Sequence, residues 1–205
     1  MSKEIIIKNA LNLFANFGIK GVSMSQIAES LRISKKTLYV YFNNKEELLC
    51  ACLDIEYENI SDILKNIEKQ AKDPVHSIVL LAFNFNQSRS FFCPAFYKDI
   101  QHFYHANCKL IEMQKYMQQK FIYYFQKGIK DGFFQPESNY EVIVSVFTEQ
   151  ILLANENQSK ISHPSHKAIL FLTFLRGLST EKGISMLEKL IPKEEEKEIY
   201  EYENK

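Results

Sequence analysis

The chain has 205 residues, 46% of them hydrophobic, so it can bury a large core and is not intrinsically disordered. Only six glycines and five prolines occur, which favours long helices over a many-stranded sheet. The formal net charge is zero, which argues against a protein coated with basic residues. No apolar run approaches the ~20 residues that a membrane-spanning helix needs. The composition predicts a soluble, all-helical protein.

The charges are unevenly distributed along the chain. Residues 1–53 contain seven lysines and arginines and four glutamates, a net charge of +3, so the remainder carries −3. A basic N-terminal segment followed by an acidic one fits a DNA-binding head attached to a part with another role.

The four cysteines form no CxxC pair, and Lys3, Glu4 and Lys8 interrupt any apolar run at the N-terminus. The cysteine pattern indicates reduced thiols, and the N-terminus does not resemble a signal peptide. Both features predict a cytoplasmic protein.

The N-terminal segment predicts three short helices. The first ends at Gly18, where a left-handed turn is permitted, and its apolar stripe comprises Ile6, Ala10, Leu13, Phe14 and Phe17. Ser23 and Gln26 have the spacing of a capping box that opens the second helix, whose inward side is Ile27, Ala28 and Leu31. Ser34 can cap the third helix, in which Leu38 and Phe42 lie one turn apart on the buried face.

A long fourth helix is predicted from Asn44 to Asp73-Pro74, about 28 residues or about 40 Å. Further helices are expected over 74–90, 94–105, 109–130 and 140–157. After a polar loop, a ninth helix carries AILFLTFL (168–175), and 193–205 form a solvated helical tail. Because the ninth helix is apolar nearly all round, a partner subunit is expected to cover one face.

The outward face of the third helix combines several kinds of chemistry. With Leu38 and Phe42 buried, the opposite side offers amine and hydroxyl donors for phosphates and base edges, and apolar atoms for a thymine methyl group. The helix start at Ser23 has free backbone N–H groups that suit a phosphate, and Lys45 repeats this arrangement at the fourth helix. One surface lysine would mean little, but this convergence predicts a recognition helix for the DNA major groove.

Residues 17–49, FGIKGVSMSQIAESLRISKKTLYVYFNNKEELL, resemble the DNA-binding signature of the tetracycline-repressor (TetR) family of bacterial transcription regulators. The string TLYxYFxxKEELL is matched at 37–49 and IAxxL at 27–31. Weaker similarities, GIKDGFFQP and FLRGLSTEKG, extend the resemblance toward the C-terminus. The resemblance implies a helix-turn-helix domain over 1–47 and an effector-binding and dimerisation domain over 48–205. The residues that it implies at the DNA are Ser23, Ser25, Lys35, Lys36, Thr37, Tyr39, Val40, Tyr41 and Lys45.

Two residues depart from the family pattern. Arg32 occupies the turn position where glycine is common, so it must accept a left-handed penalty of ~1 kcal/mol or the turn must adjust. Val22 stands where threonine is frequent, which leaves Ser23 as the cap and phosphate donor.

The family resemblance also implies a homodimer formed by the last two large helices. Such a dimer would bind a near-palindromic operator with recognition helices about 34 Å apart. A small effector would bind among the fifth to eighth helices, and the abundant Phe and Tyr suit an apolar or aromatic one. Plain core packing is the commoner explanation for any one aromatic or methionine at helical spacing. The candidate pocket residues are Phe83, Phe96, Phe103, Met113, Tyr116, Met117, Tyr124 and Phe147.

Other function classes have weaker support. His102, His105 and Cys108 are spaced by three, but a helix break expected near Ala106 separates them, so no metal site and no cofactor are predicted. The motifs GxGxxG, GK[ST], GxSxG and HExxH are absent, which argues against an enzyme. The prediction is a DNA-binding regulator, with repression as the family's commoner mode. The alternative is a DNA-binding protein-interaction module without an effector.

Overall fold

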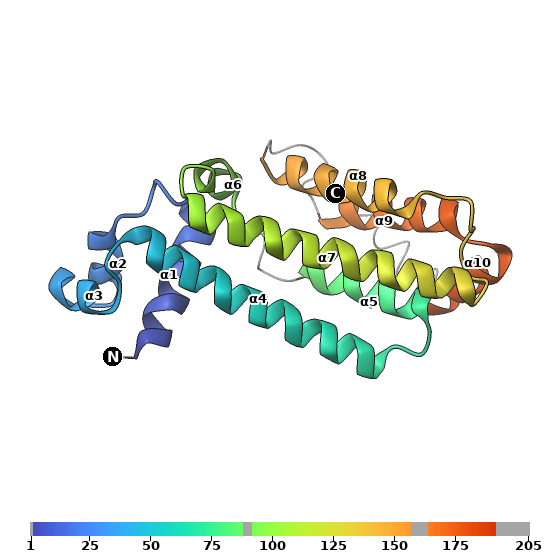
Figure 1. Cartoon of the computed structure of the whole chain (residues 1–205), viewed down its shortest axis with the longest axis horizontal. Coiled ribbons are helices and arrows are strands. Elements are labelled where there is room, and N and C mark those ends of the chain that lie inside the picture. Colours follow the sequence, from blue (N-terminus) through green and yellow to red (C-terminus); the bar gives the residue numbers. More distant parts are fainter. Residues whose placement is uncertain (1, 88–91, 157–163, 192–205) are drawn as a thin grey trace, which may run out of the picture. The chain divides into compact units, whose positions relative to one another are not determined.

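The structure is a computed structural model that describes residues 2–87, 92–156 and 164–191 (Figure 1). Within these ranges the regular elements are helices, and the one isolated bridge pairs Phe134 with Ser179. The expected all-α fold is confirmed. In the same ranges, no helix has the length and apolar character required to cross a membrane.

The chain packs as two compact units. The first contains the described parts of 1–61, 89–115 and 155–157, and the second those of 62–88, 116–154 and 158–205. Both α4 (Lys45–Gln70) and α7 (Tyr104–Lys130) contribute residues to each unit. The division at residue 47 concerns function and stays a prediction.

The first unit is built around one hydrophobic cluster. Its complete helices are α1 (Lys3–Phe17), α2 (Met24–Ser30), α3 (Lys35–Tyr41) and α6 (Pro94–Ile100). They pack with the N-terminal parts of α4 and α7, and the cluster includes Phe14, Ile27, Leu38, Phe42 and Phe96. A three-helix head therefore forms as expected, but α6 and the start of α7 complete its core.

The predicted stripe of α1 is wrong at its end. Ile6, Ala10 and Phe14 are buried, whereas the Phe17 side chain is 64% exposed. Gly18, with φ of 74°, turns the chain directly after Phe17, and Ile19 takes the buried position instead.

The predicted boundary between the sixth and seventh helices is also wrong. The break falls at residues 101–103, where the Phe103 N–H donates to the Ile100 carbonyl, and α7 begins at Tyr104. Ala106 is fully buried within α7, and the His105 N–H is satisfied by the Glu46 carboxylate at 2.8 Å. No glycine or proline near residue 106 would have stopped the helix.

The second unit contains three complete helices, most of α8 (Tyr140–Glu156) and the remaining parts of α4 and α7. The complete helices are α5 (Pro74–Gln87), α9 (Pro164–Leu178) and α10 (Glu181–Leu190). Helix α9 begins inside the predicted polar loop, because Pro164 suits the first helical position. The end of the predicted fifth helix and the C-terminal tail lie outside the described residues.

Helix α10 lies between the predicted ninth helix and the predicted C-terminal tail, where no helix was expected. The Thr180 side chain caps α10 by accepting from the Gly183 N–H at 3.2 Å, and it also donates to the Gly132 carbonyl at 2.8 Å. A Cβ atom at Gly183 would lie only 2.1 Å from the Phe133 carbonyl oxygen. Glycine is therefore required where α10 meets the turn after α7.

Candidate nucleic-acid interface

Helix α2 begins with the predicted capping box. The Ser23 Oγ accepts from the Gln26 N–H at 3.2 Å, and the Ser23 N–H donates to Gln26 Oε1 at 2.7 Å. Met24, Ile27 and Ala28 are buried on the opposite face. This arrangement confirms the predicted cap and leaves Ser23 and Ser25 exposed at the helix start.

The turn between α2 and α3 contains a strained residue. Arg32 has φ of 56°, the left-handed region that glycine favours. Its N–H donates to the Glu29 carbonyl at 2.9 Å, and the following Ile33 N–H donates to Ala28 at 3.0 Å. The sequence left open whether Arg32 would adopt a left-handed conformation or the turn would adjust. The structure shows the first: the turn keeps its shape, and Arg32 adopts the left-handed conformation at a cost of ~1 kcal/mol.

Helix α3 is capped and anchored as expected. The Ser34 Oγ accepts from the Thr37 N–H at 3.0 Å and lies 2.7 Å from the Thr37 hydroxyl. Leu38 and Phe42 are buried in the core of the first unit. The burial of these two side chains determines which side of α3 faces outward.

The outward side of α3 is basic and partly apolar. Lys35 and Lys36 are exposed, and Val40, at 77%, is the most exposed large hydrophobic residue in the described ranges. The Lys35 ammonium lies 5.9 Å from the centre of the Tyr39 ring, so this ring sits beside a positive charge. The surface can offer both charged donors and a methyl contact to a ligand.

The acidic residues at the start of α4 are occupied by the protein itself. Glu47 Oε2 accepts from the Asn43 N–H and side-chain amide at 2.8 and 2.9 Å, and the Glu47 N–H donates to Asn44 at 2.8 Å. Glu46 accepts from the His105 N–H. Each carboxylate therefore stabilises a helix start within the first unit.

Lys45 lies in a partly enclosed position that the sequence did not reveal. Its ammonium is 5.8 Å from the centre of the Phe14 ring and 6.0 Å from that of Phe103. Burial lowers the pKa of this ammonium, and the Asp99 carboxylate partly offsets the effect. The side chain must extend away from the two rings to reach a phosphate.

Asp99, whose charge acts on Lys45, is a neighbour that the sequence did not reveal. It is 8% exposed and accepts a hydrogen bond from the Lys20 backbone N–H at 2.6 Å, so it ties α6 to the loop after α1. A Cβ atom at Gly18 would approach the Ala95 Cβ to 2.7 Å, which shows how closely α6 packs there. The available signal was an acidic residue in a short helix whose one other charged residue is Lys98.

The predicted DNA-contacting residues lie on three neighbouring segments of the first unit: α2 with its cap, α3, and the start of α4. Their direct contact with DNA stays a prediction. Exposed members of the set are Ser23, Ser25, Lys35, Lys36, Tyr39 and Val40, and half-buried members are Thr37, Tyr41 and Lys45.

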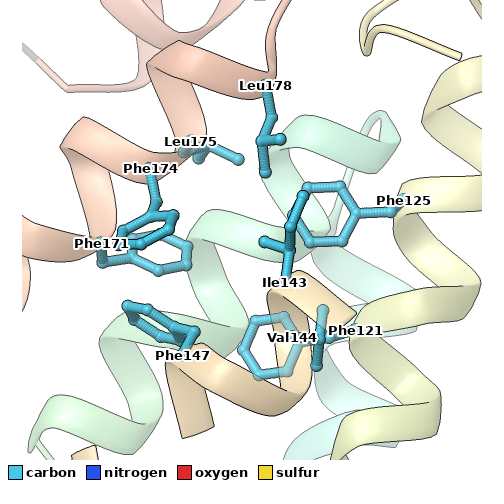
Figure 2. A pocket seen from close by; sticks show the side chains of 9 residues that line it. All are labelled: Phe121, Phe125, Ile143, Val144, Phe147, Phe171, Phe174, Leu175 and Leu178. Atoms are coloured by element: carbon cyan, nitrogen blue, oxygen red, sulfur yellow. The ribbon is translucent and has the colours of Figure 1, made fainter. Parts of the chain in front are cut away.

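The second unit contains an aromatic hollow, shown in Figure 2. Phenylalanine rings from α7, α8 and α9 face one another across it. Its free space is about 20 Å³, which corresponds to one water molecule. The lining residues are Phe121, Phe125, Ile143, Val144, Phe147, Phe171, Phe174, Leu175 and Leu178.

Of the candidate effector residues, Phe147 lines this hollow. Phe96, Phe103 and Met113 instead pack in or against the core of the first unit, and the Phe96 ring stacks on Phe92 at 3.7 Å. The remaining candidates belong to the second unit but do not line the hollow: Phe83, Tyr116, Met117 and Tyr124.

The possible metal ligands are separated by the turn between α6 and α7. His102 lies in that turn, whereas His105 and Cys108 lie on α7. Among the described residues, no group of three histidine, cysteine or acidic side chains is placed to hold a metal ion.

Known proteins resemble the first unit in sequence and the whole chain in fold. The profile of the family described as "Bacterial regulatory proteins, tetR family" matches residues 6–52. YuxN of Bacillus subtilis, an uncharacterized HTH-type transcriptional regulator, is 36% identical over 72 residues, which cover 35% of this chain and 25% of YuxN. IcaR of Staphylococcus epidermidis, a negative transcriptional regulator of the biofilm operon icaADBC, is 41% identical over 46 residues, 22% of this chain and 25% of IcaR.

These matches thus span about a quarter of the two relatives. The similarity in fold covers more of the chain than the similarity in sequence. The crystal structure of a TetR-family regulator from Cytophaga hutchinsonii has a TM-score of 0.70 and 18% identity, and the alignment covers 89% of this chain and 99% of that one.

A capped helix-turn-helix with a basic outer face, in an all-helical fold shared with known regulators, defines a DNA-binding transcription regulator. Residues 6–52 match the tetR family of bacterial regulatory proteins, and the chain shares the fold of a solved TetR-family regulator. Because this family consists of transcription factors and not of enzymes, the expectation of a non-enzymatic protein is confirmed.

Proposed function

We propose that the protein is a homodimeric repressor that binds a near-palindromic operator through α2 and α3. A small apolar or aromatic effector, bound in the second unit, releases it. The observation that carries the DNA-binding part is the outer face of α3, where Lys35, Lys36 and Val40 are exposed opposite the buried Leu38 and Phe42. The role of IcaR as a negative transcriptional regulator supports repression as the mode.

The DNA contacts divide into two groups by chemistry. Lys35, Lys36 and Val40 read base edges, because amines and an exposed aliphatic group at the outer face suit the major groove. The serine-capped start of α2 and the start of α4 position the protein on phosphates, with the hydroxyls of Thr37, Tyr39 and Tyr41 and with Lys45. Ser23 and Ser25 act at the first of these helix starts.

The dimer forms through α8 and α9. Val142 and Val146 lie one turn apart on α8 and are 56% and 43% exposed, and Phe174 on α9 is also exposed. Large apolar side chains at this spacing are favourable when a second subunit covers them. Two heads in one dimer would read half-sites about 34 Å apart.

Selection of bound DNA from random sequence, together with sedimentation of the free protein, tests this proposal. We expect a near-palindrome with half-sites one helical turn, or a small multiple, apart, and a dimer at micromolar concentration. A monomer in sedimentation, or a single unrepeated site, would contradict the proposal.

The narrow hollow favours a second candidate, the protein-interaction module without an effector. Free space of about 20 Å³ cannot hold a ring compound unless side chains move. A thermal-shift screen against apolar compounds, read beside operator binding, separates the two functions. Stabilisation by a compound that also releases DNA supports the effector; indifference to all compounds with intact DNA binding supports the interaction module.

A further inference from the structure

Tyr124 on α7 has a hydrogen-bonding group that the protein does not use. The side chain is 3% exposed, and its hydroxyl is the one buried side-chain nitrogen or oxygen in the described ranges without a hydrogen-bond partner. Tyr140, also buried, gives the contrast, because its hydroxyl donates to the Gln135 carbonyl at 2.7 Å. A buried hydroxyl without a partner is unfavourable in a folded protein.

The Tyr124 hydroxyl is a hydrogen-bond donor at neutral pH. Burial, with a further contribution from the Glu68 carboxylate, raises its pKa to about 12. The group therefore stays protonated and offers an O–H to whatever enters its surroundings.

Neighbouring polar groups already have partners. The Glu68 carboxylate, whose charge acts on the Tyr124 hydroxyl, binds the Lys120 ammonium at 3.0 Å. Because Glu68 and Lys120 pair with each other, the Tyr124 hydroxyl has no hydrogen-bond acceptor from the described part of the protein.

The aromatic hollow lies next to Tyr124 along α7. Phe121, three positions earlier, and Phe125, one position later, both line it. At 100° per residue, Tyr124 leaves the helix about 60° from Phe121 and about 100° from Phe125, so it lies on the flank of α7 beside the hollow without lining it. Every residue that lines the hollow is apolar, as Figure 2 shows, so an entering molecule meets no charged group there.

We propose that Tyr124 is the polar anchor of the effector site and donates its O–H to an uncharged carbonyl or ether oxygen of an otherwise apolar effector. This inference rests on the proposed function, since it assigns the chemistry of the effector. The apolar part of the molecule occupies the hollow after the surrounding phenylalanine side chains move apart. A carboxylate is disfavoured, because the lining offers no cation to offset its desolvation.

The test uses a matched pair of probes, acetophenone and α-methylstyrene, which have the same shape and differ in a carbonyl oxygen against a methylene group. Dissociation constants are measured by ligand-observed NMR on the full chain without DNA. We expect acetophenone to bind more tightly by about twofold to tenfold. Tyr124→Phe abolishes this preference, and the matched control Tyr140→Phe retains it.

Equal affinity of the two probes, a preference that survives in Tyr124→Phe, or no binding of either probe at millimolar concentration would overturn the inference. Thermal denaturation gives an independent check. Tyr124→Phe should unfold at a temperature no lower than the wild type, because it removes an unpaired buried hydroxyl, whereas Tyr140→Phe should unfold lower. A lower unfolding temperature for Tyr124→Phe would mean that the hydroxyl is already satisfied.

Operator affinity is measured separately with acetophenone present. If the ketone binds through Tyr124 and operator affinity does not change, the proposed release of DNA by an effector is contradicted, and the role of Tyr124 in binding is supported. If operator release occurs with a compound that binds equally well to Tyr124→Phe, the anchor fails while the proposed function stands.

Discussion

At the scale of single residues, α3 has one buried face and one exposed face. The buried Leu38 and Phe42 give the helix its place in the core, and nothing in the first unit covers the Val40 side chain opposite them. An aliphatic group held outward on a rigid, basic helix suits a thymine methyl group in the major groove.

Val40→Ala should remove a preference for thymine at one position of each half-site. Stability should change by less than about 0.5 kcal/mol, because the side chain is exposed. Deoxyuridine at that position deletes only the methyl group, so it should weaken binding of the wild type and leave the variant unaffected. Titration of labelled operators measures both effects; equal sensitivity of the two proteins to deoxyuridine would exclude the contact.

Lys45 and Lys36 should respond differently to loss of charge. Lys45→Met keeps apolar contact with the Phe14 and Phe103 rings but cannot bind a phosphate, so it should weaken binding to all sequences and lower the salt slope by about 1. Lys36→Ala should change preference at particular base pairs. Binding of sequence variants at several salt concentrations measures this difference; uniform weakening by both changes would exclude base reading by Lys36.

The residue scale also shows what the sequence could not predict. The spacing of Leu38 and Phe42 was enough to orient α3, because it depends only on helical periodicity. The position of Lys45 was not predictable, because Phe103 and Asp99 are more than fifty residues away and meet it only after α6 packs on α1.

At the scale of elements, short helices depend on their ends. Helix α2 has only seven residues, too few to be stable alone, so the Ser23 capping box and the burial of Ile27 and Ala28 both contribute to its stability.

Substitution of Ser23 can separate its capping role from its predicted phosphate contact. Ser23→Ala should lower the free energy of unfolding by about 1 kcal/mol, whereas Ser23→Asn and Ser23→Asp should largely keep the cap. Ser23→Asp should still lose DNA affinity, because its charge repels a phosphate. Urea denaturation and operator binding give the two readouts. Normal DNA binding by Ser23→Asp would place the phosphate contact elsewhere.

Arg32→Gly should stabilise the turn between α2 and α3. Glycine adopts the observed φ of 56° without strain, and its greater freedom in the unfolded chain offsets part of the gain, so we expect about 0.5–1 kcal/mol. Urea denaturation measures the change, with Arg32→Lys as the control that keeps both charge and strain. A loss of stability in Arg32→Gly would show that the arginine side chain contributes more than its strain removes.

Element prediction succeeded where the signals were local and failed where they were distant. The Ser23 and Ser34 caps depend on residues three positions apart and were read correctly. Helix α10 was missed although Thr180 caps it locally by accepting from the Gly183 N–H, because its start also depends on Thr180 binding the carbonyl of Gly132, far away in sequence. The turn before α7 likewise depends on the Glu46 side chain, which accepts the N–H of His105.

At the scale of the whole molecule, the proposed function needs two copies of the chain. Val146→Glu places a charge on the exposed apolar face of α8, where it should prevent association without unfolding the second unit. We expect a helical monomer in sedimentation and circular dichroism, and weak operator binding. Ile111→Glu, at an exposed apolar position in the first unit, is the control and should remain dimeric. A dimeric Val146→Glu protein would move the interface away from α8.

The core of the first unit has a consequence for building chimeric regulators. Phe96, Ile100, Ala106 and Leu110 are buried in the same cluster as Leu38 and Phe42, although they follow in the chain after α5. Recombining this head with the sensor part of another regulator by a single crossover at residue 47 would replace those four residues with foreign ones. A functional hybrid therefore calls for a second crossover that carries residues 92–115 together with the head.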